Sequence, residues 1–336
     1  MRHETALDVD REPHGSSDDE TLVDFSANTN PETPAGVETV YREAFEDARR
    51  YPPEPPTAYC EAAAAFVDCA PEQVIPTPGG LAAIRLVIDL AVEPGDSVLV
   101  PAPGFAEYAR EVRLQGGDCA FYPEDDLDAV DPEGHALAVV CRPNNPTGTV
   151  YEPASLDAFL RRCRATDTLV LADEAFLGFT DRASLAGSGG VVVARSLTKL
   201  FGLPGLRAGF AVGTGAHREA LRRARRVWNL GSAALATGEY CLRQQAFVDR
   251  TRERVRDERD RLQRRLADSF EVTASGGPFL LLDVGDRSVD AVVDGARERG
   301  IAIRDATTFR GLDSHVRVAV RLPAENDRLL EVLRAV

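Results

Sequence analysis

The amino-acid sequence predicts an α/β protein in which helices wrap a large, mostly parallel sheet and a second, smaller α+β unit follows. The main observation is a rhythm of short apolar runs that alternate with longer amphipathic segments through the middle of the chain, as in strands joined by crossover helices. The second is size, because 336 residues, 44% of them hydrophobic, can bury two cores. The third is a change of pattern near residue 245, where one long charged helical segment begins.

The expected elements follow this rhythm along the chain. Five short apolar runs are predicted to be buried strands of the large sheet: 97–100, 137–140, 168–172, 191–194 and 209–212. An apolar helix is expected over 82–92, a charged amphipathic helix over 246–269, strands over 279–284 and 316–320, and a helix over 289–299. We therefore expect residues 1–45 to form an N-terminal arm and part of the small domain, 46–243 the large domain and 244–336 the rest of the small domain. Residues 1–24 are polar and are expected to be flexible unless they fold over a site.

The negative charge of the chain disfavours two kinds of partner, and the spacing of its cysteines argues against disulfides and a metal site. Asp and Glu number 54 against 39 Lys and Arg, a formal charge of −15 that disfavours nucleic acid and anionic membrane. This acidic balance with almost no lysine is typical of proteins from salt-loving microbes. Neither a signal peptide nor a membrane-spanning run is found, so a cytoplasmic protein is expected. The six cysteines are scattered without a C-x-x-C pair, which predicts neither a disulfide framework nor a metal site.

Lys199 is the only lysine of the chain, since the other 38 basic residues are arginines. An arginine keeps its proton in a protein, whereas a desolvated lysine amine can lose its proton and act as a nucleophile. The segment 196–199 comes just after a predicted strand, as do the polar segments 142–148 and 173–176. Open α/β sheets place ligands at such strand ends. Each segment alone is an ordinary turn or helix cap, but their order and spacing indicate a site.

Ser196-x-x-Lys199, with Arg207 eight residues beyond the lysine, resembles the cofactor-lysine signature of fold-type I pyridoxal-phosphate enzymes in the aspartate aminotransferase superfamily. The resemblance extends from Asp24 to Leu330. It implies that Lys199 binds the cofactor covalently and then moves protons, and that Asp173 pairs with the pyridine nitrogen. It also implies that Asn145 donates to the 3′-oxygen of the ring, with a cis peptide bond between Asn145 and Pro146.

The same resemblance implies how the cofactor phosphate is bound. Gly79, Gly80 and Leu81 precede the apolar helix, so their amides are expected to meet the phosphate at a helix N-terminus. The family more often has a small residue and Ser, Thr or Asp where Gly80 and Leu81 stand, so backbone donation is retained and a hydroxyl contact is lost. Ser196 and Arg207 are expected to complete the phosphate site.

Two aromatic residues also match the family motif, and a third departs from it. Phe105 is expected to stack on the pyridine ring, and Tyr51 to reach the cofactor phosphate of a neighbouring subunit, which implies a homodimer. Phe176 stands where many aminotransferases of this superfamily have Tyr, whose hydroxyl also bonds the 3′-oxygen. A different electronic tuning of the cofactor is therefore expected.

Arg317 and two stretches of the sequence indicate which substrates and which reaction to expect. The resemblance implies that Arg317 binds the α-carboxylate of a substrate. Segments 14–15 with 24–31, and 300–305 with 309–312, resemble L-threonine-O-3-phosphate decarboxylases of cobalamin biosynthesis, which make (R)-1-aminopropan-2-ol phosphate and carbon dioxide. Such a small phosphorylated substrate needs a second anion pocket, for which the candidates are His14, Arg304 and Arg321, with Asn30 at the entrance and Arg142 as a weaker candidate.

Two alternatives stay open at this stage. Histidinol-phosphate aminotransferases share the cofactor machinery and also take a phosphorylated substrate, and the sequence does not reveal which bond of the substrate α-carbon is held perpendicular to the cofactor ring. A non-enzymatic pyridoxal-phosphate module of a transcription regulator is disfavoured, because only about 24 polar residues precede the first segment that resembles the family.

Overall fold

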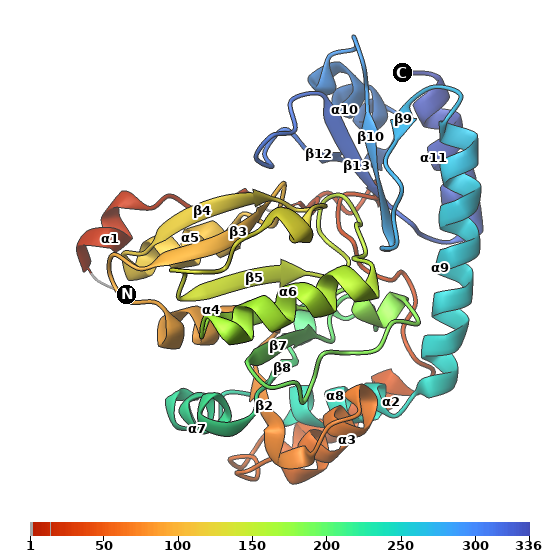
Figure 1. Ribbon diagram of the computed structural model, residues 1–336. Helices are drawn as coiled ribbons and strands as arrows, with labels where there is room; N and C mark the ends of the chain where they lie inside the picture. Colours follow the sequence, from red (N-terminus) through yellow and green to blue (C-terminus); the bar gives the residue numbers. More distant parts are fainter. Residues whose placement is uncertain (1–2, 14) are drawn as a thin grey trace.

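A computed structural model of the chain describes residues 3–13 and 15–336. A seven-stranded sheet lies at its centre, in the order β2-β8-β7-β6-β5-β3-β4 (Figure 1). Its strands are β2 (Val74–Thr77), β3 (Ser97–Ala102), β4 (Asp118–Pro123), β5 (Leu137–Cys141), β6 (Leu169–Asp173), β7 (Val191–Ser196) and β8 (Gly209–Val212). Strand β8 is antiparallel to both β2 and β7, and the other neighbours are parallel. The predicted α/β fold with a mostly parallel sheet is confirmed.

Helices cover both faces of this sheet and link it to the rest of the chain (Figure 1). The described helices of the whole molecule are α1 (His3–Asp8), α2 (Val37–Asp47), α3 (Thr57–Val67), α4 (Gly80–Ala91), α5 (Glu107–Gln115), α6 (Pro153–Ala165), α7 (Gly215–Ala224), α8 (Ser232–Leu242), α9 (Gln245–Leu266), α10 (Val289–Glu298) and α11 (Pro323–Arg334), with 3-10 turns η1 (Pro71–Gln73), η2 (Leu127–Ala129), η3 (Leu177–Phe179) and η4 (Pro204–Leu206). Of these, α10 and α11 lie with the small sheet (Figure 1). All five residues of β5 and of β6 are buried, as expected for central parallel strands that are covered on both faces. No described helix is long and apolar enough to cross a membrane.

A second, smaller sheet of four strands lies in the C-terminal part of the chain. Its order is β12-β13-β10-β9, with β9 (Glu271–Val272), β10 (Phe279–Asp283), β12 (Arg304–Asp305) and β13 (His315–Ala319). The N-terminal strand β1 (Val23–Asp24) pairs in parallel with β11 (Ile301–Ala302), so the beginning of the chain joins its C-terminal part. The domain boundaries remain a prediction, but this pairing agrees with a small unit built from both chain ends.

Helix α9 runs from the large sheet to the small one along one side of the molecule (Figure 1). Its buried residues recur at helical spacing, with Val248, Val255 and Leu262 each seven residues apart. Two arginines of α9 contact both parts: Arg252 Nε donates to the carbonyl of Gly178, and Arg254 Nη1 to that of Arg321. The helix therefore fixes how the two sheets face each other across the site.

The N-terminal arm crosses the large sheet instead of extending into solvent. The Thr5 hydroxyl donates to the carbonyl of Leu114, and Arg110 Nε donates to the carbonyl of Asp10, so the arm is held on α5. Beyond Asp10 the arm continues over the carboxyl ends of the strands. Residues 1–24 were expected to be flexible unless they fold over a site, and the described part of the arm lies over one.

Candidate active site

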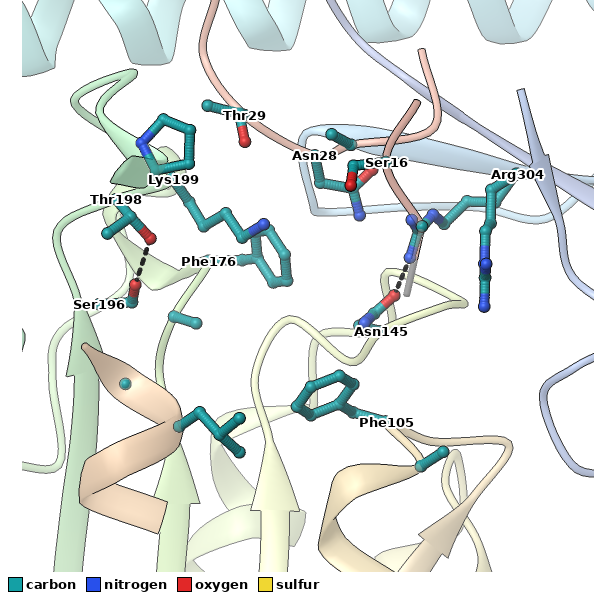
Figure 2. Close-up of a pocket in the computed structure, with 18 of the residues that line it drawn as sticks. Ser16, Asn28, Thr29, Phe105, Asn145, Phe176, Ser196, Thr198, Lys199 and Arg304 are labelled. Carbon is teal, nitrogen blue, oxygen red and sulfur yellow. Dashed lines mark hydrogen bonds between the residues drawn. The ribbon is translucent and has the colours of Figure 1, made fainter. Parts of the chain in front are cut away.

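A cavity of about 740 Å³ lies between the two sheets, at the carboxyl ends of β5, β6 and β7. Most of the predicted cofactor residues line it: Gly80, Leu81, Phe105, Asn145, Asp173, Phe176, Ser196, Lys199 and Arg207. Figure 2 shows the side chain of Lys199 reaching into this cavity, with Asn145 and Phe105 across from it. The fold thus brings together residues that are separated by more than 100 positions in the sequence.

Lys199 lies on the turn that follows β7, and its environment favours the neutral amine. Burial lowers the pKa of Lys199, and so do the positive charges of Arg317 and Arg207, to about 8, while the Asp24 carboxylate acts in the opposite direction. An ammonium in water titrates near 10.4. About a tenth of this amine is therefore unprotonated at pH 7, against roughly a thousandth or less for an ordinary lysine, and the neutral amine is the form that acts as a nucleophile.

Asp173 ends β6 as a buried carboxylate with two hydrogen-bond donors. The Tyr108 hydroxyl donates to its Oδ2 atom at 2.6 Å, and the Ala175 amide to Oδ1 at 2.9 Å. Burial raises the pKa of Asp173, whereas these two donors lower it. A carboxylate in such a place gains most from a cationic partner, and a protonated pyridine nitrogen is one.

The start of α4 and the turn after β7 form a cradle suited to a phosphate. Gly79 has φ +95°, and a Cβ atom there would lie 2.7 Å from Arg207 Nη2. A Cβ atom on Gly80 would lie 3.1 Å from Cβ of Ser196. The Ser196 and Thr198 hydroxyls are 2.8 Å apart at the same place (Figure 2). The first amides of a twelve-residue helix, an arginine and two hydroxyls thus converge, which fits a phosphate-bearing cofactor.

Asn145 and Arg317 join the two sheets at the opposite wall. Arg317 Nη1 donates to Oδ1 of Asn145 (Figure 2), and Nη2 donates to the carbonyl of Ser26 at 2.8 Å. Asn145 Oδ1 is thereby occupied, which leaves its amide nitrogen as the donor for a ligand oxygen. The peptide bond between Asn145 and Pro146 is cis, as predicted.

Arg304 and Arg317 are direct cross-strand partners of β12 and β13. Burial and the positive charge of Arg304 together lower the pKa of Arg317 to about 9, while the Asp24 carboxylate acts in the opposite direction. Like charges directly opposite each other destabilise a strand pair, so this pair favours an anion between or beside the guanidinium groups. Arg304 Nη2 donates to the carbonyl of Pro13 and the hydroxyl of Thr308, which ties the N-terminal arm to the same wall.

Arg321 lines the cavity, but its terminal nitrogens are already bonded. They donate to the carbonyl of Asp24 and to the Glu325 carboxylate, each at 3.0 Å. Arg317 is likewise bonded through both terminal nitrogens, whereas Arg304 is bonded through Nη2 alone among the described residues. Of the three arginines, Arg304 therefore has the most donor capacity left for a substrate anion.

Two predicted substrate residues lie elsewhere. Asn30 does not line the cavity; its amide nitrogen donates to the carbonyl of Leu200, and its oxygen accepts from Arg254. This corrects the expectation that Asn30 lies at the entrance, and Asn28 lines the cavity instead. Arg142 is paired with the buried Glu174 at 2.8 Å and is likewise not part of the wall.

The remaining predicted residues have different outcomes. His14 lies outside the described residues. Tyr51 is 77% exposed and stacks on Trp228 at 4.4 Å between ring centroids, so its reach into a neighbouring subunit stays a prediction. Phe176 lies edge-on to Phe279 and, as the sequence indicated, offers no hydroxyl to the cavity.

Sequence reasoning missed several polar groups of the wall, above all Tyr108 and Thr198. Tyr108 lies in the first turn of α5 and Phe105 two residues before that helix, with their rings edge-to-face 5.5 Å apart. The three-residue spacing from the predicted stacking residue was a usable signal that Tyr108 belongs to the wall, although it did not indicate the bond to Asp173. The arm residues Ser16 and Ser17 carried no such signal, because their place in the wall depends on the path of the arm.

Comparison with known proteins agrees with this geometry. The family model described as "Aminotransferase class I and II" matches residues 20–333. A histidinol-phosphate aminotransferase of Halobacterium salinarum is 32% identical, over 99% of this chain and 94% of the relative. Among solved structures, a histidinol-phosphate aminotransferase from Clostridium acetobutylicum has a TM-score of 0.85 at 22% identity, covering 94% of this chain and 98% of that one. An L-threonine-O-3-phosphate decarboxylase from Porphyromonas gingivalis has a TM-score of 0.84 at 24% identity, covering 94% and 99%. At these identities the two structures show the shared fold alone.

Proposed function

Because this chain belongs to the class I and II aminotransferase family, whose members depend on pyridoxal phosphate, we propose that it acts on a small amine or amino acid that carries a phosphate ester. The observation that carries this proposal is the cross-strand pair of Arg304 and Arg317, which shares one cavity with Lys199. A guanidinium group binds phosphate or carboxylate through two parallel hydrogen bonds. A substrate amine that reaches Lys199 would thus have an anionic group held beside it.

The residues of the cavity have distinct proposed roles. The cofactor supplies an electron sink for the substrate α-carbon when it is bound. Lys199 holds the cofactor and then moves the proton, which suits an amine whose pKa is about 8. Asp173 is the anionic partner of the pyridine nitrogen, and Asn145 donates to the 3′-oxygen. Phe105 stacks on the ring.

The phosphate of the cofactor has its own proposed site, separate from the substrate anion site. It is formed by the amides of Gly79, Gly80 and Leu81, the Ser196 hydroxyl and the Arg207 guanidinium. These groups lie at the start of α4 and after β7, whereas Arg304 and Arg317 lie on the small sheet. Two anion sites on opposite walls fit one phosphorylated substrate beside one phosphorylated cofactor.

Transamination of the histidinol-phosphate type is the first candidate reaction. It is supported by the curated relatives, which are 32% identical over almost the whole chain and carry that name. In this reaction the two arginines would hold the phosphate of the amine donor in one half-reaction and a carboxylate of the keto acid in the other.

Decarboxylation of L-threonine O-3-phosphate is the second candidate, and one observation favours it. Arg304 and Arg317 lie side by side, so they can hold the phosphate and the carboxylate of a single small substrate at the same time. The Phe176 side chain fits this reading as well, because it departs from the tyrosine of many aminotransferases. The place of such an enzyme in cobalamin biosynthesis is part of this second proposal.

One experiment separates the two reactions. The holoenzyme is incubated with L-threonine O-3-phosphate without a keto acid, and separately with histidinol phosphate and 2-oxoglutarate. Release of carbon dioxide in the first mixture supports decarboxylation, and formation of glutamate in the second supports transamination. Absence of both products overturns the proposal of a phosphorylated substrate.

Two variants control this experiment. Lys199→Arg keeps the positive charge but cannot supply a free amine, so turnover is expected to be lost in either reaction. Arg304→Gln is expected to raise the KM for the phosphorylated substrate more than tenfold, as for loss of a charged hydrogen-bond partner. An unchanged KM would show that the phosphate binds elsewhere.

A homodimer is proposed as the active form. Large apolar side chains are exposed on α2 and in the segment that follows α7: Tyr41, Phe45, Val227 and Trp228, and the exposed Tyr51 stacks on Trp228. Grouped exposed apolar residues indicate an interaction surface, and the family resemblance gives Tyr51 a role in the partner's site. The molecular mass of wild type and of Tyr51→Ser, measured by analytical sedimentation, tests the proposed homodimer. A wild type that is monomeric and fully active would contradict it.

A further inference from the structure

Tyr108 is a buried polar side chain that contacts Asp173 and has no role so far. Its hydroxyl group donates to Oδ2 of Asp173 at 2.6 Å, and its side chain is completely buried in the first turn of α5. Short hydrogen bonds to a carboxylate are among the strong ones. This bond connects α5 to the end of β6, 65 positions further along the chain.

We propose that Tyr108 is a positioning residue that holds Asp173 as an anion, with one side of the carboxylate turned to the pyridine nitrogen of the cofactor. This rests on the proposed function, since Asp173 is assigned to that nitrogen there. It adds a residue to the site that neither the sequence motifs nor the family resemblance pointed to.

The geometry of the carboxylate supports this role. The Ala175 amide donates to Oδ1 and Tyr108 to Oδ2, so each oxygen has one donor that fixes its orientation. Each carboxylate oxygen has two lone pairs. The carboxylate therefore keeps acceptor capacity for one more donor, and a protonated ring nitrogen is a donor of the right kind.

The chemistry of the donor matters as much as its position. Burial and the adjacent Asp173 charge raise the pKa of Tyr108, so the phenol keeps its proton and acts toward Asp173 only as a donor. The other ionisable groups around the pair are the Cys141 thiol on β5, the Glu174 carboxylate just after β6 and the Arg195 guanidinium on β7. Glu174 raises the pKa of Asp173, and Arg195 lowers it. The two nearest donors, Tyr108 and Ala175, thus oppose the effect of burial.

Tyr108→Phe removes only the hydroxyl group and keeps the ring against Phe105. We expect the dissociation constant for pyridoxal phosphate to rise about tenfold or more, the effect of losing a hydrogen bond to a charged group. We also expect the absorption spectrum of the bound cofactor to change with pH over a different range than in wild type, because Asp173 loses a donor that stabilises its anion.

Tyr122→Phe is the matched control. Tyr122 is also buried, and its hydroxyl donates to a backbone carbonyl, that of Val139, at 2.7 Å. Both variants lose one buried hydrogen bond, so thermal unfolding should change by similar amounts in the two. Only Tyr108→Phe should alter cofactor affinity and spectrum.

Each result has a distinct meaning. If Tyr108→Phe and Tyr122→Phe bind pyridoxal phosphate like wild type and with the same spectrum, the positioning role of Tyr108 is refuted. If wild type itself binds no pyridoxal phosphate, the proposed function fails first. Asp173→Asn sets the scale: its loss of affinity should exceed that of Tyr108→Phe, and a smaller loss would also refute the inference.

Discussion

Replacement of Glu174 by glutamine should destabilise the whole molecule. Glu174 is completely buried at the end of β6, where it accepts hydrogen bonds from Arg142 Nη1 at 2.8 Å and Arg195 Nη1 at 3.2 Å. The Ser184 hydroxyl and the Leu185 amide also donate to it, at 2.6 and 2.9 Å. One carboxylate therefore ties together the ends of β5, β6 and β7 beneath the site.

The magnitude follows from burial. Glu174→Gln keeps the shape of the side chain but leaves two buried guanidinium groups without a counter-charge. Removing one member of a buried ion pair costs about 3–5 kcal/mol. The entropy of unfolding is about 2.1 cal/mol/K per residue, or about 0.7 kcal/mol/K for 336 residues. The midpoint of thermal unfolding should therefore fall by about 4–7 °C.

Glu219→Gln provides a matched control for circular dichroism melts. Glu219 also accepts from two arginines, Arg222 at 2.8 Å and Arg223 at 2.6 Å, but on the exposed surface of α7. Exposed pairs contribute little to stability and are screened by salt, whereas buried pairs are screened much less. The fall in the unfolding midpoint caused by Glu174→Gln should persist in molar KCl. A fall no larger than that caused by Glu219→Gln, whether at low salt or in molar KCl, would refute the reasoning.

Two further predictions concern the cofactor site. The pKa of about 8 for Lys199 places its loss of a proton near pH 8, so capture of pyridoxal phosphate by the apoprotein should increase as the pH rises through that value. A midpoint above pH 10 would contradict the electrostatic account. Gly79→Ala and Gly95→Ala both place a side chain at positive φ, +95° and +90°, but only the first meets an arginine, Arg207. Fluorescence titration should show weaker cofactor binding for Gly79→Ala alone, and equal losses in both variants would exclude the phosphate cradle.

The sequence predicted the elements that depend on local patterns. The central strands are continuous apolar runs because both faces are covered, and β5, β6 and β7 start within one residue of their predicted positions. Strand β4 was missed, since its burial is partial and its sequence mixes polar and aromatic residues at the sheet edge. Helix α4 begins at Gly80 and not at residue 82, because the glycine turn itself forms the first helical residues.

The residues of the site likewise include some that local sequence motifs predict and some that they do not. Motif residues such as Lys199 and Asp173 could be placed from sequence, because Asp173 lies at the end of a strand and Lys199 in the turn after one. The partners that depend on tertiary folding could not, as Tyr108 shows: it lies 65 positions from Asp173, and no local pattern joins them. Asn30 was misassigned for the same reason, because its amide satisfies the Leu200 carbonyl in the folded chain instead of facing the cavity.

The single lysine has a physical explanation in this arrangement. The proposed anion sites are formed by arginines, and the charges of Arg317 and Arg207 are part of what lowers the pKa of Lys199. An arginine at position 199 would add a further permanent cation and no nucleophile. Anions that bind to Arg317 and Arg207 neutralise the charges that depress the amine pKa, so binding should raise it again. The same cations would thus increase the neutral fraction of the amine in the free site, and their neutralisation by bound phosphate groups would favour its protonation, which is the change that a group accepting a proton during turnover needs.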